Sequence, residues 1–241
     1  MADAGQLIVP MRGALIPVPS QPQVGVCAIC HSSAKPGFAT CRPCTDAARL
    51  NPPEILPIAL SVHGGLLHAH LRGYKDSPSV TARVRMSLRL AGVLAMFMAQ
   101  HEGCIGEWDI VTCVPSPGRV ALQPVVTRVR ELAGRFRQVL AAQPDADERT
   151  MDPEQFAVTE DVAGRRVLLL DDTFVSGAKL FSAVAALRRR DAVVVGPVVI
   201  GRHIQRGWPP SADLLSWIEE RAWSERRCAR CAGERRSGTL F

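Results

Sequence analysis

The chain has 241 residues, of which 47% are hydrophobic and 22% are charged, and its formal net charge is +6. This composition is close to that of an average globular protein with one sizeable core and a small appendage, and it is unlike that of a disordered chain. The positive charge is carried far more by arginine than by lysine. It is compatible with phosphate-bearing ligands or nucleic acid, and equally with a GC-rich genome.

Residues 1–23 are apolar and rich in proline without a clear period, and we expect a flexible N-terminal arm. The stretch lacks the basic start and the long apolar core of a signal peptide. The most apolar window, residues 86–99, is too short to cross a membrane and contains Arg89, so we expect a core helix there. These features predict a cytoplasmic protein without membrane insertion.

Residues 24–50 carry a cysteine framework of their own, with one CxxC pair at Cys27 and Cys30 and another at Cys41 and Cys44. This spacing lets both thiolates of a pair reach one tetrahedral ion at about 2.3 Å, and four thiolates leave no open position. We therefore expect a zinc ribbon whose structural Zn²⁺ supplies folding energy to a segment too short for its own core. Four free thiols or two local disulfides are the alternatives.

A third CxxC pair, Cys228 and Cys231, lies in a predicted basic tail at residues 223–241. It has no second cysteine pair near it in the sequence. Metal binding across a subunit interface and redox chemistry are open alternatives, but we expect both thiols to be unliganded. Cys104 and Cys113 stand alone and are expected to be ordinary buried cysteines.

Residues 57–222 alternate between strand-like and helix-like patterns, after a boundary marked by "NPPEILP". Short apolar runs between turn signals predict strands, and helical spacing predicts helices. The expected strands are 56–62, 66–74 (or a turn), 108–115, 167–170 and 192–201, and the expected helices are 77–100, 121–142 and 177–189. This alternation predicts an α/β fold with a parallel sheet covered on both faces.

The stretch "RRVLLLDDTFVSGAKL" has the form of a ligand site. Its apolar strand ends in Asp171 and Asp172, at the carboxyl end where open parallel sheets bind ligands. The next loop leads to a helix N-terminus, which favours an anion. Gly177 would let the backbone approach that anion, and Ser176 and Lys179 offer a hydroxyl and a positive charge. The pattern suits a phosphorylated sugar with Mg²⁺; alternatively, the acids only cap a helix or hold an arginine.

The same stretch resembles the phosphoribosyl-diphosphate (PRPP) signature of type I phosphoribosyltransferases: an apolar strand, two acids, a spacer and a phosphate loop. Upstream, "QFAVTEDVAGRRVLLL" is similar to the lead-in to that signature. A four-cysteine ribbon in front of such a domain resembles the ComF family of competence-associated proteins, and "LLHAHLRGYKD" and "VTCVPSP" resemble two further regions of that family. The resemblance covers residues 27 to about 200 and implies a type I phosphoribosyltransferase-like domain behind the ribbon.

The resemblance also implies a role for each matching residue. Asp171 and Asp172 would bind the ribose hydroxyls of PRPP, directly or through Mg²⁺, and Tyr74 and Lys75 would lie near the pyrophosphate. The substrate-binding set is completed by the phosphate loop and its neighbours: Thr173, Val175, Ser176, Gly177, Ala178 and Lys179. Val175 and Lys179 depart from the family pattern, and "SPGRVALQPVVTRVREL" stands where the family has an Arg-x-Arg-Gly-Phe-Asn-Gln stretch.

If the chain is an enzyme, the resemblance implies transfer of ribose 5-phosphate with release of pyrophosphate, and a link to DNA uptake through competence-machinery proteins. The departures leave turnover open and favour the alternative of a PRPP or nucleotide sensor. A third hypothesis is a protein that associates with single- or double-stranded DNA through its ribbon and basic helix faces. The arginines on those faces are Arg83, Arg85, Arg89, Arg128, Arg130, Arg135 and Arg137. Three histidines lie near Tyr74, but none stands out as a general base: His63, His68 and His70.

Overall fold

A computed structural model of the chain describes residues 10–20, 25–116, 122–144, 147 and 149–231. The expected N-terminal arm therefore lies partly outside the described residues, and so does the expected basic tail beyond residue 231. Within the part that is described, no helix has the length and apolarity needed to cross a membrane.

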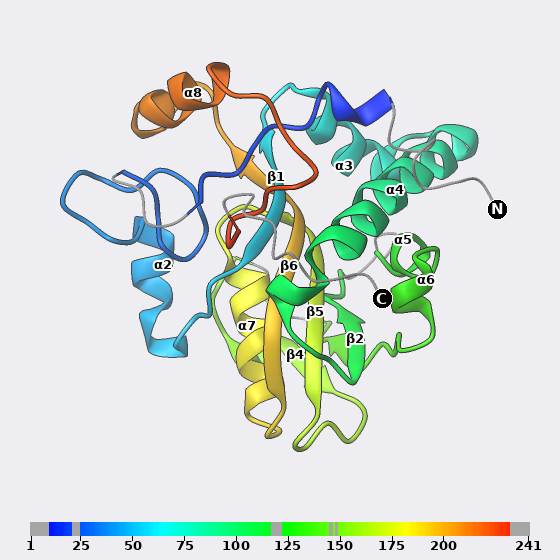
Figure 1. Ribbon diagram of the computed structural model, residues 1–241. Helices are drawn as coiled ribbons and strands as arrows, with labels where there is room; N and C mark the ends of the chain where they lie inside the picture. The colour runs from blue at the N-terminus through cyan, green and yellow to red at the C-terminus, as the bar shows by residue number, and fades with distance from the viewer. Residues whose placement is uncertain (1–9, 21–24, 117–121, 145–146, 148, 232–241) are drawn as a thin grey trace, which may run out of the picture.

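The chain folds into helices and strands that alternate over most of its length (Figure 1). The strands are β1 (Leu56–Val62), β2 (Ile110–Cys113), β3 (Leu140–Ala142), β4 (Phe156–Val158), β5 (Arg166–Phe174) and β6 (Val193–Ile204). The α-helices are α2 (Arg42–Asp46), α3 (Leu66–Asp76), α4 (Val80–Ile105), α5 (Gln123–Val126), α6 (Arg130–Ala133), α7 (Ala178–Arg188) and α8 (Ala212–Glu219). The described residues also form three short 3-10 helices, η1 (Ala47–Leu50), η2 (Pro153–Gln155) and η3 (Pro209–Ser211).

Four strands form a parallel sheet in the order β1-β6-β5-β2. Every residue of β1 and of β2 is buried, which is typical of parallel strands covered on both faces. The expected α/β fold with a parallel sheet is confirmed. Because the strands are parallel, their carboxyl ends meet at one edge, and β5 lies between two neighbours at that edge.

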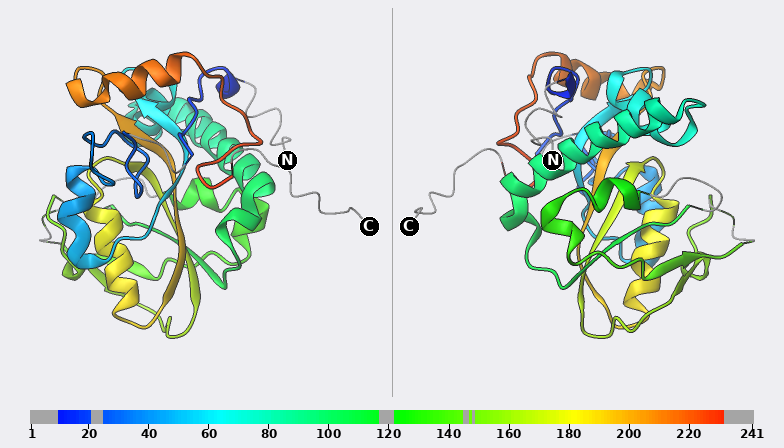
Figure 2. Two further views of the ribbon diagram at one scale, coloured as in Figure 1. Left: turned by 60° about the vertical axis from the view of Figure 1, so that its left-hand side comes forward. Right: turned by 90° about the vertical axis from the view of Figure 1, so that its right-hand side faces the viewer.

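The two faces of the sheet are covered by different elements (Figure 2). Side chains alternate along β5, so that Leu168 and Leu170 pack in one core with helices α3 and α4. Val167 and Leu169 pack in a second core with helix α7 and the four N-terminal cysteines. The cysteine segment therefore shares the hydrophobic core of the sheet, and its helix α2 leads into η1 beside α7.

Residues 66–74, expected to form a strand or a turn, belong instead to helix α3. The buried residues of α3 are Leu67, His70, Leu71 and Tyr74, which recur every three or four positions as on one face of a helix. The alternation of leucine and histidine in "LLHAHL" fits a strand equally well over so short a run, and that expectation is wrong. The next helix, α4, begins after Ser79, whose hydroxyl accepts a hydrogen bond from the N–H of Ala82, and not after Ser77 as expected.

The long helix expected over 121–142 is also wrong. The described part of this segment, residues 122–142, holds only α5, α6 and β3, since Val129 is extended and interrupts the helical pattern. The backbone of 135–137 instead follows β2: the N–H of Val111 donates to the carbonyl of Arg135, and the N–H of Arg137 donates to the carbonyl of Val111. Strand β2 lies at the edge of the sheet, and its backbone groups need hydrogen-bond partners on that side. Pairing with residues 135–137 supplies them, and this pairing outweighs the helical pattern of the segment.

Candidate functional site

The acid pair lies where the central strand β5 reaches the carboxyl edge of the sheet. Asp171 is in register with Val199 of β6. Successive strand residues point to opposite faces, so Asp171 and Asp172 have different surroundings. The strand was expected to end at Leu170, but β5 includes both acids and continues to Phe174.

Asp172 is buried and is held by two side chains of helix α3. The hydroxyl of Tyr74 donates to its Oδ2 across 2.5 Å, and Nζ of Lys75 forms an ion pair with the same oxygen. A buried carboxylate requires such partners to offset its lost hydration. Burial and the charge of Asp172 raise the pKa of Tyr74, so its hydroxyl keeps its proton and remains a donor. Tyr74 and Lys75 therefore contact the acid pair directly.

Asp171 is the more accessible of the two acids. Its Oδ1 accepts the backbone N–H of Asp172 at 2.8 Å. Limited hydration and the nearby charge of Asp172 raise the pKa of Asp171 to about 7, against the opposing charges of Lys75 and Lys179. At neutral pH this carboxyl is therefore only partly ionised. Its ionised form can accept a hydrogen bond from a hydroxyl or bind a cation.

Gly177 makes the sharp turn from β5 into helix α7. Its φ is +87°, and an added Cβ would lie 2.6 Å from the rings of both Phe174 and Phe181. Only glycine fits this position without strain. The backbone therefore turns tightly onto the N-terminus of α7, whose first N–H groups have no partners within the helix. Ser176 is exposed beside this turn, and its Oγ accepts the N–H of Ala178 at a long 3.4 Å.

Lys179 connects this helix start to the loop after β2. Its Nζ donates to Oγ of Ser116 across 3.1 Å, so the described end of the loop after β2 and the predicted phosphate loop lie side by side. Of the remaining predicted residues, Val175 is exposed, Thr173 is partly exposed and Ala178 is buried. Residues 117–121, part of the stretch that replaces the family's arginine motif, lie outside the described residues.

Taken together, this edge of the sheet combines oxygen ligands with positive charge. Asp171 and Asp172 offer carboxylate oxygens, which Mg²⁺ prefers. Lys75, Lys179 and the start of α7 offer positive charge and N–H donors, which suit phosphate. The arrangement can bind a ligand that carries hydroxyls, phosphate and an associated divalent cation.

Three histidines gather at the same edge, but they are not the three that lie close in sequence. The rings of His63 and His68 are 4.7 Å apart, and those of His68 and His203 are 5.2 Å apart. His70 is buried elsewhere, with Nδ1 facing the carbonyl of Leu66 and Nε2 facing Arg89. Sequence reasoning missed His203, because it reaches the group only through the pairing of β6 with β1.

The four N-terminal cysteines form a compact cluster. All four are buried, and their sulfur atoms lie within 4.8 Å of one another. Sγ of Cys30 and Sγ of Cys41 are 3.6 Å apart, close to the sulfur–sulfur separation of about 3.8 Å that a tetrahedral zinc site with 2.3 Å bonds requires. Cys27, Cys30, Cys41 and Cys44 thus have the donor set and spacing to hold zinc.

A buried arginine on β6 lies against this cluster. Arg202 approaches Sγ of Cys30 to 3.6 Å, and it donates to the carbonyls of Phe174 and His203. Hydrogen bonds from the other three thiols and the charge of Arg202 lower the pKa of Cys30. A buried guanidinium requires a negative partner, and the thiolates of a zinc site would supply it. Sequence reasoning missed Arg202.

No protein-family model matches the chain. Among solved structures, the chain is similar to a phosphoribosyltransferase from Corynebacterium diphtheriae, with 23% identity, a TM-score of 0.32, and coverage of 50% of this chain and 78% of that one. It is also similar to orotate phosphoribosyltransferase from Mycobacterium tuberculosis H37Rv in two complexes. The complex with inorganic phosphate has 20% identity, a TM-score of 0.29, and coverage of 56% and 66%. The complex with PRPP has 20% identity, a TM-score of 0.31, and coverage of 64% and 80%.

Proposed function

We propose that the chain is a ComF-like protein of the phosphoribosyltransferase family that binds PRPP with Mg²⁺ at the carboxyl end of β5. One observation carries the proposal: only a few residues separate Asp171 and Asp172 from the turn at Gly177 that leads into helix α7. The sequence there follows the order of a PRPP signature. Lys75 of helix α3 forms an ion pair with Asp172, and Lys179 in the first turn of α7 contacts Ser116 in the loop after β2.

The 5′-phosphate would bind at the turn from Val175 to Lys179. Gly177 lets the backbone N–H groups at the start of α7 face the phosphate, and Ser176 adds a hydroxyl. The exposed Val175 replaces a hydroxyl residue of the family pattern, so the backbone and the charge of Lys179 would provide most of the binding.

The ribose hydroxyls would bind at Asp171, with Asp172 behind it. Asp172 is already engaged by Tyr74 and Lys75, so its main role would be to position the acid pair and to maintain its charge. Mg²⁺, held through these carboxylates, would bridge ligand oxygens and offset their negative charge. Lys75 would lie toward the pyrophosphate.

If the chain is an enzyme, a nucleophile forms a bond to the anomeric carbon while the bond from that carbon to the pyrophosphate oxygen breaks. Positive charge develops on the sugar and negative charge on the leaving pyrophosphate, and fixed charges at the site would stabilise both. Val175, Lys179 and the missing arginine stretch favour the second candidate, a sensor that binds PRPP or a nucleotide without turnover.

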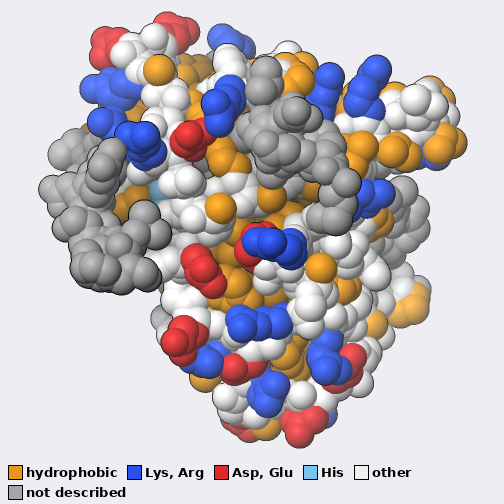
Figure 3. Space-filling view, turned by 45° about the vertical axis from the view of Figure 1, so that its right-hand side comes forward, with side chains coloured by type: hydrophobic (Ala, Val, Ile, Leu, Met, Phe, Trp, Pro, Cys, Tyr) orange, Lys and Arg blue, Asp and Glu red, His pale blue; other side chains and the backbone are white. Residues whose placement is uncertain are grey.

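The third candidate function is nucleic-acid binding. Whichever function holds, we propose a structural Zn²⁺ at the N-terminal cysteines. A link to DNA uptake through competence-machinery proteins rests only on the ComF resemblance. Two of the arginines expected on a basic face have partners within the protein. Arg83 donates to the carbonyl of Ser77, and Arg89 contacts Nε2 of His70. On the face in Figure 3, acidic and basic side chains are interspersed over the lower half of the molecule. These observations favour the sugar-phosphate ligand over DNA, and a cytoplasmic location fits that ligand.

The test is a calorimetric titration of the zinc-loaded full chain with PRPP and Mg²⁺. We expect binding by the wild type and its loss in Asp171→Asn, while the matched variant Asp213→Asn, altered at an exposed acid of α8, binds as the wild type does. No binding by the folded wild type would contradict the proposal. Pyrophosphate release on addition of purine or pyrimidine bases would support the enzyme, and binding without release would support the sensor. A steep salt dependence of DNA affinity would support the third candidate.

A further inference from the structure

The third CxxC pair does not stand alone in the fold. Cys228 and Cys231 lie against the end of helix α4, beside His101 and Cys104. Two further potential ligands thus lie beside a pair that stands alone in the sequence, and one of them, Cys104, is only partly buried and not fully buried as expected. The C-terminal segment, drawn in red in Figure 1, meets α4 although 130 residues separate Cys231 from His101.

The four donor atoms lie close enough together for one metal ion to bind all of them. Sγ of Cys231 lies 3.4 Å from Sγ of Cys228 and 3.4 Å from Nδ1 of His101. Sγ of Cys104 lies 4.0 Å from the same nitrogen, and all four donors fall within 4.8 Å of one another. Around zinc, sulfur–sulfur and sulfur–nitrogen separations are about 3.8 and 3.6 Å, given bonds of about 2.3 and 2.05 Å.

The second nitrogen of His101 fixes its tautomer. Nε2 lies 2.9 Å from the carbonyl oxygen of Glu225. A carbonyl can only accept a hydrogen bond, so Nε2 carries the proton of the neutral ring and the lone pair of Nδ1 faces the sulfurs. Metal-bound histidines commonly have this second contact. His101 is also the residue of α4 that departs from helical backbone angles (φ −128°, ψ 15°), and this kink lies at the position from which the ring reaches the cysteines.

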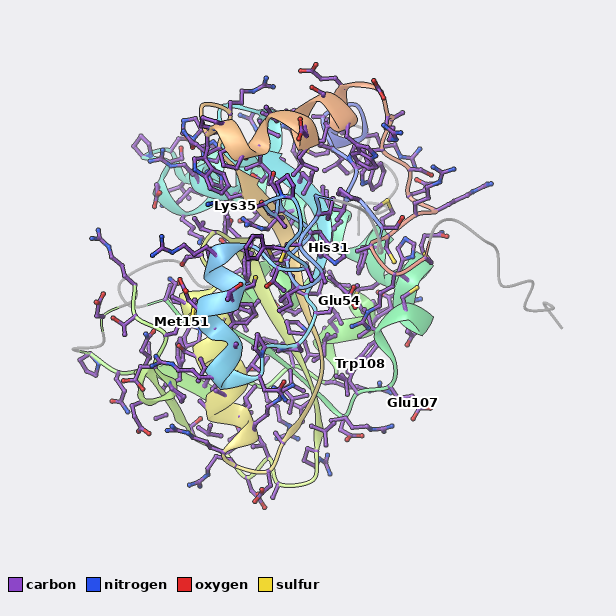
Figure 4. The ribbon with its side chains drawn as sticks, turned by 90° about the vertical axis from the view of Figure 1, so that its left-hand side faces the viewer. His31, Lys35, Glu54, Glu107, Trp108 and Met151 are labelled. Atoms are coloured by element: carbon purple, nitrogen blue, oxygen red, sulfur yellow. The ribbon has the colours of Figure 1, made fainter. Side chains whose placement is uncertain are left out.

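Backbone and side-chain hydrogen bonds hold the CxxC turn in place. The N–H of Cys228 donates to the carbonyl of Cys231 across 3.2 Å. Arg230 also donates to the carbonyl of Cys104 across 2.8 Å and to Glu54 across 2.9 Å. Glu54 in turn approaches Nε2 of His31, next to the first cysteine cluster, to 3.3 Å; Figure 4 labels both residues.

We propose that His101, Cys104, Cys228 and Cys231 bind a second Zn²⁺, which fastens the C-terminal segment to helix α4. Nδ1 of His101 and three thiolates would complete a closed tetrahedral shell, and binding would release the three thiol protons. A disulfide between Cys228 and Cys231 would use only two of these side chains and would leave His101 and Cys104 without a role. The 3.4 Å between the two sulfurs also exceeds the S–S bond length of about 2.05 Å.

The two sites differ in exposure. The first cluster is buried at all four cysteines, whereas Cys104 and Cys231 are only partly buried. The second site is therefore the more open to a chelator. Zinc should leave the chain in two phases, with the faster phase coming from the C-terminal site.

The test begins with the wild type, so that folding of a variant does not decide it. The full chain, purified under reducing conditions without chelator, should contain two zinc ions. Its average zinc shell by X-ray absorption should include a minor nitrogen contribution beside sulfur. One zinc ion with a purely sulfur shell would overturn the proposal, as would a disulfide between Cys228 and Cys231 in the reduced, zinc-supplied protein.

Variants then assign the second ion. Cys104→Ser and His101→Gln should each lose one of the two zinc ions and the fast release phase. Two controls should keep both ions: Cys113→Ala, a buried cysteine outside both clusters, and Glu102→Gln, an exposed neighbour of His101. If Co²⁺ is bound in place of zinc, the wild type should show spectra of two different shells, and only the all-sulfur spectrum should remain in His101→Gln. Retention of both zinc ions in both ligand variants would contradict the proposal.

Discussion

The hydroxyl of Tyr74 donates a hydrogen bond to Oδ2 of Asp172 across 2.5 Å and 98 residues of sequence. The bond joins helix α3 to the end of the central strand β5. It engages one acid of the pair, and the other acid, Asp171, is the more exposed of the two. The protein thus holds Asp172, and Asp171 is the acid that we propose contacts a ligand.

Removing this bond should weaken both the fold and the site. Tyr74→Phe leaves the buried Asp172 with Lys75 but without its hydroxyl partner, which should lower the free energy of unfolding by about 1–3 kcal/mol. PRPP binding should also weaken. Urea denaturation and calorimetry would measure the two effects. Thr127→Val removes an exposed hydroxyl that donates to the carbonyl of Gln123, and it should change the stability by no more than about 0.5 kcal/mol. Equal effects of the two variants would argue against a structural role for the Tyr74–Asp172 bond.

The turn into α7 should not tolerate a side chain. Gly177→Ala places a Cβ 2.6 Å from two phenylalanine rings at a φ of +87°. Strain and overpacking together should cost about 2–4 kcal/mol, and PRPP binding should be lost. In contrast, Gly134→Ala adds a methyl group to open space at a φ of −70°. Thermal unfolding of both variants would check the difference, and a fully stable Gly177→Ala with normal binding would refute the close approach.

Ligand binding should strengthen as the pH rises through neutrality. The pKa of Asp171 is raised to about 7, and only its ionised form can bind a cation or accept a hydroxyl proton. Between pH 6 and pH 8 the affinity for PRPP with Mg²⁺ should rise about tenfold from this group. Since phosphate groups also titrate near pH 6, Asp171→Asn is the control. Any PRPP binding that remains in this variant should depend less on pH than binding by the wild type. The same pH profile in both proteins would contradict the assignment of this pH dependence to Asp171.

The same carboxyl has the opposite effect on stability without a ligand. Its pKa is higher in the folded chain than the value near 3.9 of an unfolded aspartate, so the native state holds a proton that the unfolded chain has released. Asp171 should therefore lower stability as the pH rises from about 4 to about 7. The free energy of unfolding of Asp171→Asn, measured against pH, should fall less over this interval than that of the wild type.

Arg202 should matter to the first cysteine cluster. Arg202→Met removes the positive charge that lies 3.6 Å from Sγ of Cys30, which should speed zinc release by a chelator and lower the stability by about 3 kcal/mol or more. Arg42→Met is the matched control, because Arg42 follows Cys41 in the sequence but its side chain is 93% exposed. Equal zinc release from both variants would show that Arg202 does not stabilise the cluster.

Several features of this protein could be predicted from the sequence because they are local. The run of apolar residues in β5, the two acids that end it and the glycine before α7 lie within a dozen positions. The four N-terminal cysteines likewise need only short spacers to meet. Where the pattern itself was ambiguous, local reasoning was wrong: "LLHAHL" suits a strand or a helix, and the packing of Leu67, Leu71 and Tyr74 against the sheet settled it as a helix.

The remaining contacts depend on distant parts of the chain. Tyr74 meets Asp172 only because α3 packs on the face of the sheet where that acid ends. Arg202 reaches Cys30 across 172 residues, and Cys231 reaches His101 across 130. Each pair joins one short motif to a side chain that has no distinctive sequence of its own. By itself, the sequence determined the motifs, whose residues lie within a few bonds of one another. Only the tertiary structure decided their partners, because packing and strand pairing bring together residues that the chain keeps far apart.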